Sequence, residues 1–241
     1  MSEMNSIETT GSQQELNTIQ RMFGVFFSPK KTFEDIDRKP DWVVPFVVIL
    51  VIMVVFTIVT MPITLPERME IQREKMEERG MSDEQIDAAM ATGEKIGKIM
   101  GPIGAAITIG IMLVIFTLIL WFVGNIVLGG QTTFKKMFSV YNYSSLIGML
   151  GLLVSIPLII SKQTANVHFS LALLLPEDQS KTVLYNVLKA LGLFSIWQYV
   201  VLAIGFAVIY KFSMKKAGFT MLILFIIYVI VTVTMSQIFG Q

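Results

Sequence analysis

The side chains best placed to do chemistry in this 241-residue sequence are uncharged polar groups in apolar surroundings. They are Asn125, Tyr141, Asn142, Ser144, Ser145 and Gln198. Such groups can join neighbouring helices by hydrogen bonds, each contributing about 0.6 kcal/mol and at most 1–2 kcal/mol. They could also line a small polar cavity. We expect intramembrane polar packing, with the cavity as the alternative.

Catalytic signatures are missing from the sequence. It has no cysteine, no phosphate-binding glycine motif, no H-E-x-x-H and no G-x-S-x-G. The single histidine, His168, has no acidic residue within six positions on either side. We therefore expect no enzyme activity, no catalytic residue, no cofactor and no metal site.

Hydrophobic residues make up 54% of the chain and charged residues only 15%, against about 25% in soluble domains. Five stretches are long and apolar enough to cross a bilayer, which takes about 20 residues. They are residues 42–63, 103–128, 138–160, 188–210 and 219–239. This pattern predicts an all-α membrane protein, a bundle of about five transmembrane helices.

Charged residues are almost entirely outside these stretches. Only Lys189 falls within one, at the edge of the fourth. Short connections at Lys135–Lys136 and Lys211–Lys216 are basic and free of acids, which places them in the cytoplasm by the positive-inside tendency. We expect a cytoplasmic N-terminus and an outer C-terminus. The net charge of +1 argues against nucleic acid as a partner.

The connection at residues 64–98 carries nine acidic and six basic residues. Gly80 can end one helix, and Ser82 with Gln85 forms a capping box for another. We expect an extramembrane helical hairpin on the outer surface, with Ile86 on the apolar face of its second arm. It is either a solvated helix pair or a surface on which a partner docks.

Residues 1–41 read as a cytosolic segment whose first 20 residues lack regular structure. Ser28 and Pro29 then predict the start of a short helix that runs to about Arg38. That helix has Phe33 and Ile36 on one side. It either lies in the headgroup layer as an interfacial helix or packs as a cap on the bundle.

Three local motifs resemble the bacterial branch of the Yip family, membrane proteins named for interaction with Ypt/Rab GTPases. They are FSPKKTF (27–33), followed by Pro40, Trp42 and Pro45; GGQTTFKK (129–136), followed by Val140, Tyr143 and Ser144; and Ile196-Trp197 with Gly205, Ser213, Lys215-Lys216 and Ala217. The resemblance covers about residues 27–220. It implies a five-span bundle with the N-terminus inside and the C-terminus outside.

Eukaryotic members of that family are linked to Rab recruitment, vesicle budding and membrane shaping. This sequence lacks their long N-terminal extension and acidic-aromatic motif, so we do not expect GTPase binding. The expected function is that of a non-enzymatic membrane-organising or adaptor protein, most simply of a bacterial inner membrane. Its partners would be the lipid bilayer and other membrane proteins, or a second copy through self-association. The alternative is a small transporter or an accessory subunit of a membrane export system.

Overall fold

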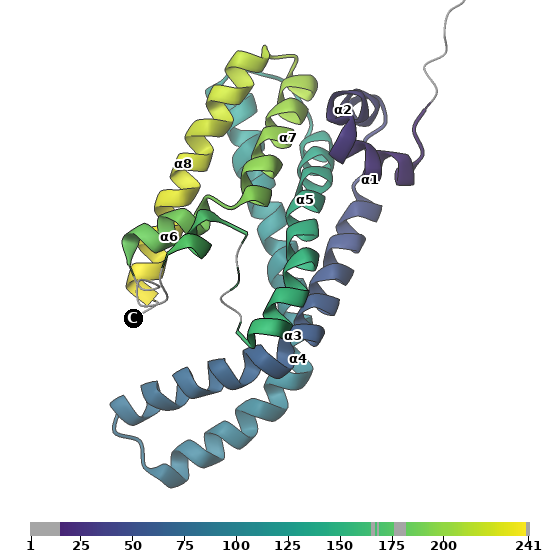
Figure 1. Cartoon of the computed structure of the whole chain (residues 1–241). Helices are drawn as coiled ribbons and strands as arrows, with labels where there is room; N and C mark the ends of the chain where they lie inside the picture. The colour runs from purple at the N-terminus through teal and green to yellow at the C-terminus, as the bar shows by residue number, and fades with distance from the viewer. Residues whose placement is uncertain (1–14, 165–166, 168, 176–181, 240–241) are drawn as a thin grey trace, which may run out of the picture.

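The computed structural model describes residues 15–164, 167, 169–175 and 182–239. Every regular element within those ranges is helical (Figure 1). In chain order the elements are α1 (Thr18–Phe27), α2 (Pro29–Arg38), α3 (Val43–Glu78), α4 (Asp83–Phe122), the π-helical turn η1 (Val123–Val127), α5 (Phe134–Lys162), the 3-10 turn η2 (Leu171–Leu174), α6 (Val183–Ala190), α7 (Leu193–Tyr210) and α8 (Met214–Phe239).

Five of these helices are long and apolar enough to cross a membrane: α3, α4 with η1, α5, α7 and α8. Their most apolar windows have mean hydropathies between 1.9 and 3.1. In three of them only 17% of that window is buried inside the protein, so most of their apolar surface faces outward. This confirms the predicted all-helical membrane fold, because such surface is stable only against lipid.

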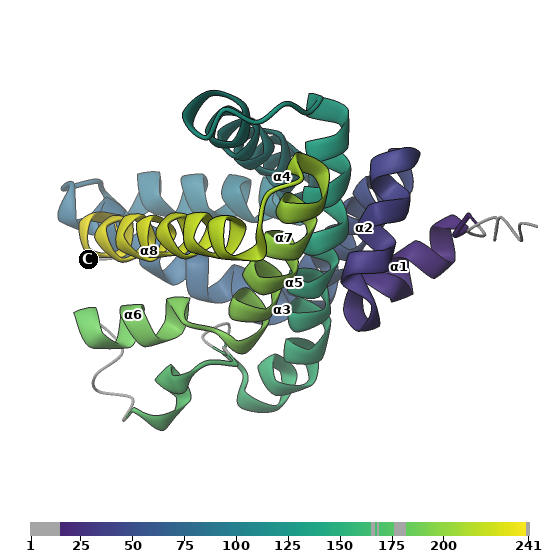
Figure 2. The same ribbon diagram turned by 90° about the horizontal axis from the view of Figure 1, so that it is seen from above.

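Helix α5 forms the centre of the bundle, with α3, α4 and α7 packed around it (Figure 2). Its buried side chains include Met137, Val140, Tyr143 and Ile147, each fully inaccessible to solvent. Helix α7 approaches closely at Gly205, where an added Cβ would lie 2.5 Å from Val140 Cγ1. The small residue therefore sets the distance between the two helices.

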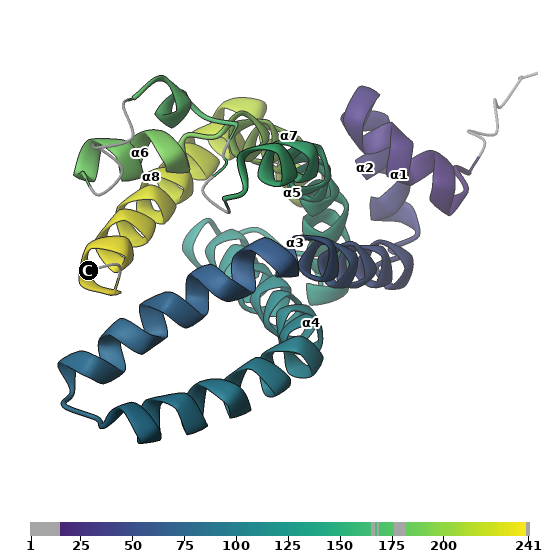
Figure 3. The ribbon, with the colours of Figure 1, turned by 60° about the horizontal axis from the view of Figure 1, so that its bottom comes forward.

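The segment between the first two spans is a helical hairpin that continues α3 and α4 without a break. The chain turns at Gly80, which has φ +73°, and the Ser82–Gln85 capping box is formed in both directions. Pro62 and Pro66 lie within α3, and Pro102 lies within α4. Prolines bend helices, and both arms turn away from the bundle axis together (Figures 1 and 3).

The fourth apolar stretch, expected as one helix over 188–210, is divided in the structure. Helix α6 ends at Ala190, and α7 begins at Leu193 behind the N-cap residue Gly192. Lys189 consequently belongs to α6 and not to the spanning helix, and burial lowers the pKa of its ammonium group. The break falls at Leu191 and Gly192, and their apolar neighbours hide it in the sequence.

The N-terminal segment forms two short helices, where we expected one. Asn17 caps α1 through a capping box with Gln20, so residues 18–20 are helical, contrary to our expectation that the first 20 residues lack structure. Residues 1–14 lie outside the described part of the chain. Helix α2 begins at Pro29 and ends at Arg38 as predicted, although the Ser28 side chain makes no capping bond.

Candidate functional site

The predicted polar residues of α5 are buried and bonded mainly to their own helix. Asn142 Nδ2 donates to the Phe138 carbonyl at 2.7 Å, and the Ser144 hydroxyl donates to the Val140 carbonyl at 2.8 Å. Asn142 and Ser144 are fully inaccessible to solvent. Bonds of this kind to the preceding turn satisfy a hydroxyl or amide without any partner helix.

Ser145 and Gln198 are the predicted residues that the structure joins across two helices. Gln198 Nε2 of α7 donates to Ser145 Oγ of α5 at 3.4 Å, while Ser145 Oγ donates to the Tyr141 carbonyl at 2.8 Å. Gly148 makes room for this contact, since an added Cβ would lie 2.6 Å from Gln198 Oε1. The Tyr141 ring lies 6.1 Å, centroid to centroid, from that of Phe116 in α4.

Asn125 lies apart from the polar residues of α5, and its side chain stabilises a turn by hydrogen bonds. Its side chain, in η1, both donates to the Thr132 carbonyl at 2.9 Å and accepts from the Thr132 amide at 3.1 Å. Trp121 Nε1 donates to the same carbonyl at 3.0 Å. These bonds fix the connection between α4 and α5, where Gly129 has φ +69°. Asn125 therefore positions the backbone and does not face the α5 cluster.

Two buried polar atoms in α5 have no hydrogen-bond partner among the described residues: Asn142 Oδ1 and the Tyr143 hydroxyl. The Tyr143 hydroxyl lies in the electrostatic field of Arg21, Asp35 and Asp41, which belong to the N-terminal segment. An unsatisfied buried polar atom costs about 1–3 kcal/mol. Asn142 Oδ1 is thus the polar atom of α5 that packing alone does not explain, whereas the Tyr143 hydroxyl has the Arg21 guanidinium beside it as a neighbour able to donate a hydrogen bond.

The most strongly bonded polar site lies in the N-terminal helices, and the sequence analysis did not identify it. Arg21 of α1 and Asp35 of α2 form an ion pair in which Nε and Nη2 of Arg21 both lie 2.8 Å from one carboxylate oxygen, Asp35 Oδ2. Their side chains are 4% and 2% exposed. Arg21 Nη1 also donates to the Lys39 carbonyl at 3.0 Å. Charges this deeply buried are stable only when paired and hydrogen-bonded, as these are.

This ion pair lies inside a cap, which we define as α1 and α2 packed on α5 and α7. Phe33 and Ile36 of α2 are fully buried in that contact. Lys136 at the start of α5 lies 2.6 Å from Asp37, which ties the cap to the bundle by charge as well. Helix α2 therefore packs as a cap on the bundle, and its place in the headgroup layer stays a prediction.

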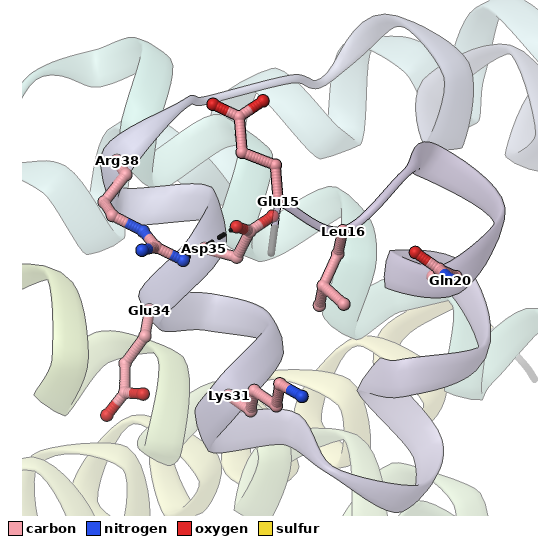
Figure 4. A pocket seen from close by; sticks show the side chains of 7 residues that line it. All are labelled: Glu15, Leu16, Gln20, Lys31, Glu34, Asp35 and Arg38. Atoms are coloured by element: carbon pink, nitrogen blue, oxygen red, sulfur yellow. Dashed lines mark hydrogen bonds and ion pairs between the residues drawn. The ribbon is translucent and has the colours of Figure 1, made fainter. Parts of the chain in front are cut away.

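A pocket of about 590 Å³ opens beside Asp35, the acidic partner in the ion pair with Arg21 (Figure 4). It is lined by Glu15, Leu16, Gln20, Lys31, Glu34, Asp35 and Arg38. Arg38 Nη2 lies 2.9 Å from Asp35 Oδ1, and Lys39 lies 3.0 Å from Glu15. Its three carboxylates, Glu15, Glu34 and Asp35, are interleaved with two cations, Lys31 and Arg38, so the lining carries an excess of one negative charge. The ion pairs around this pocket stiffen the cap.

The sequence did hold a signal for Asp35. Thr32, Phe33, Asp35 and Ile36 are the buried residues of α2, at the helical spacings i, i+1, i+3 and i+4. An acid within such an apolar face needs a buried cation. Its partner, Arg21, lies 14 residues away on another helix, and only the tertiary fold identifies it.

Within the described residues, no group of three histidine, cysteine or acidic side chains is arranged to hold a metal ion. His168 lies outside them.

Together, the five apolar helices and the cap packed on them define a multi-pass α-helical membrane protein. The Yip1 domain family model matches residues 23–235, which is most of the chain and includes α2 and the second half of α1. The chain belongs to this family. It is 32% identical over 211 residues to the membrane protein YknW of Bacillus subtilis, covering 87% of each chain. Among solved structures, none matches it.

Proposed function

We propose that this Yip-family protein is a non-enzymatic membrane-organising or adaptor protein of a bacterial inner membrane, and that it contacts partners through its hairpin. The observation that carries the proposal is the length of the first two spanning helices. Helix α3 has 36 residues and α4 has 40, or about 54 and 60 Å at 1.5 Å per residue. A bilayer core of about 30 Å cannot cover both along their whole length.

The ion pair that joins the two arms of the hairpin is exposed and weak. Arg73 pairs with Glu77 at 3.1 Å within one arm and with Asp87 at 3.6 Å across to the other. Such exposed pairs contribute about 0.2–1 kcal/mol. Ile86 is buried, whereas Ile71 and Ile96 remain 53% and 55% exposed. These two exposed isoleucines are available for contact with a partner.

An orientation with the cap in the cytoplasm is supported by charge and packing at one end of the bundle. Lys136 bonds to Asp37 of the cap, and Lys216 donates to the Leu128 carbonyl at 3.1 Å. The cap and the two acid-free basic connections, before α5 and between α7 and α8, therefore lie at the same end of the bundle. The hairpin tip lies at the opposite end (Figure 1). The positive-inside tendency favours the basic end as the cytoplasmic one.

The second candidate function is a small transporter or an accessory subunit of a membrane export system. The observation in its favour is the buried Asn142 Oδ1 in α5, which has no hydrogen-bond partner among the described residues. A polar group of that kind can serve a translocated solute. The hydroxyls of Ser144 and Ser145 beside it already bond to their own helix, which favours the adaptor.

Photo-crosslinking in native membranes tests the adaptor proposal. A photoreactive amino acid replaces Ile71 or Ile96 in the hairpin, and Ile107 of α4 serves as a matched control because it is 57% exposed on the apolar part of the same helix. We expect both hairpin positions to yield adducts with a defined protein, either another membrane protein or a second copy, and position 107 to yield lipid adducts. Lipid adducts at all three positions would refute the proposal.

A further inference from the structure

A second pocket, of about 440 Å³, lies where the cap meets the connection between α7 and α8. Its charged rim consists of Lys30, Glu34 and Asp37 from α2 and Lys211 from the connection. Its wall includes Ile204 and Val208 of α7, which are apolar. The pocket therefore combines charges with membrane-facing apolar surface, as expected at the boundary between headgroups and acyl chains.

An apolar groove of about 420 Å³ continues from this pocket between α7 and α8. Met214 lines both, and the groove extends past Ala203 and Gly218 to Ile196 and Phe225. On α7 the lining residues follow one face at spacings of three and four from Ile196 to Lys211. That face is about 22 Å long, more than half of a bilayer core of about 30 Å.

The pocket lining has two lysines and two carboxylates, and Lys136 beside Asp37 leaves one cation in excess. Asp37 is engaged by Lys136 at 2.6 Å, and Glu34 lies 4.0 Å from Lys30 in an exposed pair. Among the described residues, no carboxylate forms an ion pair with Lys211. Lys216 is engaged elsewhere, since its ammonium lies 3.7 Å from the centre of the Phe212 ring. An anionic group in the pocket would therefore meet Lys211 and Lys30 without displacing a strong pair.

We propose that this pocket and groove bind one anionic glycerophospholipid. Its phosphate contacts Lys211 and Lys30, and one acyl chain lies in the groove between α7 and α8. Charge-assisted bonds from ammonium to phosphate are among the stronger hydrogen bonds in proteins, and basic residues at a membrane surface attract anionic lipids. The site does not depend on the hairpin, so it is compatible with either candidate function.

Two residues allow the site to be altered without damage to the fold. Lys211 has φ +54°, a left-handed conformation that glycine adopts more readily, so Lys211→Gly removes the charge and relieves the backbone. Gly218 lines the groove, and an added Cβ there meets no atom within 4 Å. Gly218→Leu therefore fills the groove while it improves helix propensity.

Each variant has a matched control. Lys215→Gln removes a neighbouring exposed lysine that does not line the pocket. Gly104→Leu makes the same change in α4, at a glycine whose added Cβ also meets nothing within 4 Å. Lipid binding is measured by native mass spectrometry of the full chain in detergent, titrated with phosphatidylglycerol or with phosphatidylethanolamine of the same acyl chains. Thermal unfolding of each variant reports on the fold.

We expect phosphatidylglycerol to bind more tightly than phosphatidylethanolamine. Lys211→Gly should weaken that binding about fivefold, as expected for the loss of one contact between a lysine and an anionic lipid. Gly218→Leu should also weaken the binding, although Lys30 and Lys211 are both intact in that variant. Both controls should bind like the parent chain. Equal binding of the two lipids, or an equal loss in Lys215→Gln and Lys211→Gly, would overturn the proposal. Unchanged binding in both Lys211→Gly and Gly218→Leu would also overturn it.

Discussion

Arg21 of α1 and Asp35 of α2 form a buried ion pair, with two guanidinium nitrogens each 2.8 Å from one carboxylate oxygen. The pair closes the cap over the end of the bundle from which α5 starts. It also brings a charge close to Tyr143 in the centre of α5. The ion pair thus joins the two helices of the cap, and the buried side chains of Phe33 and Ile36 pack the cap on the bundle.

The first prediction concerns this ion pair. Arg21→Met leaves Asp35 buried without its main partner, and breaking a buried pair from one side costs about 3–5 kcal/mol. We expect hydrogen exchange across residues 18–38 to rise strongly, with little change in α8. The double variant Arg21→Met, Asp35→Leu removes both charges and should recover most of the protection. Unchanged exchange in the single variant would show that the pair does not hold the cap together.

The second prediction concerns the start of the hairpin's second arm. Ser82 accepts a bond from the Gln85 amide at 3.4 Å, and loss of an N-cap costs about 0.5–2 kcal/mol. Ser82→Ala should raise hydrogen exchange in residues 83–91 and leave the spans unchanged. Thr92→Ala is the control, because the Thr92 hydroxyl bonds to the Ala88 carbonyl in mid-helix and caps nothing. Equal effects of the two substitutions would argue against the cap.

The third prediction separates packing from a polar cavity in α5. Ser145 is 4% exposed, and its hydroxyl is already bonded within the helix. A cysteine at position 145 in this cysteine-free chain should resist a small membrane-impermeant thiol reagent. A cysteine at the exposed position 162, at the end of the same helix, should react. Strong labelling at position 145 would mean that water reaches the middle of the bundle, as the transporter alternative requires.

The fourth prediction concerns close packing at Gly205. An added Cβ would lie 2.5 Å from Val140 Cγ1 and 3.1 Å from the Phe33 ring, so Gly205→Ala must push α5 and the cap away from α7. Overpacking of this kind costs about 1–3 kcal/mol. We expect a lower unfolding temperature in detergent. Gly104→Ala, with open space around its added Cβ, should unfold at or above the parent temperature.

The spans and the hairpin turn could be predicted because their causes are local. A run of apolar residues specifies a spanning helix wherever it occurs, and the capping box at Ser82 involves a residue only three positions away. The break before Leu193 was missed because Leu191 and Gly192 continue the apolar run. Only the observed end of α6 at Ala190 reveals it.

The polar sites were harder to predict because their partners come from distant parts of the chain. Sequence alone indicated that Ser145 and Gln198 were polar and within apolar stretches, and the structure joins them over 53 positions. Asn125 belonged to the same predicted set, yet it serves a local turn at Thr132. The Arg21–Asp35 pair was overlooked because both residues lie before the first span, where charged residues are expected to be exposed to water.

We propose that the hairpin stands outside the bilayer, on the side opposite to the cap. Single cysteines at Glu84 near the hairpin tip and at Gln131 in the connection before α5 test it most directly, since both positions are exposed. In right-side-out membrane vesicles, an impermeant thiol reagent should label position 84 at once and position 131 only after permeabilisation. Protection of position 84 until permeabilisation, with immediate labelling of position 131, would contradict the account.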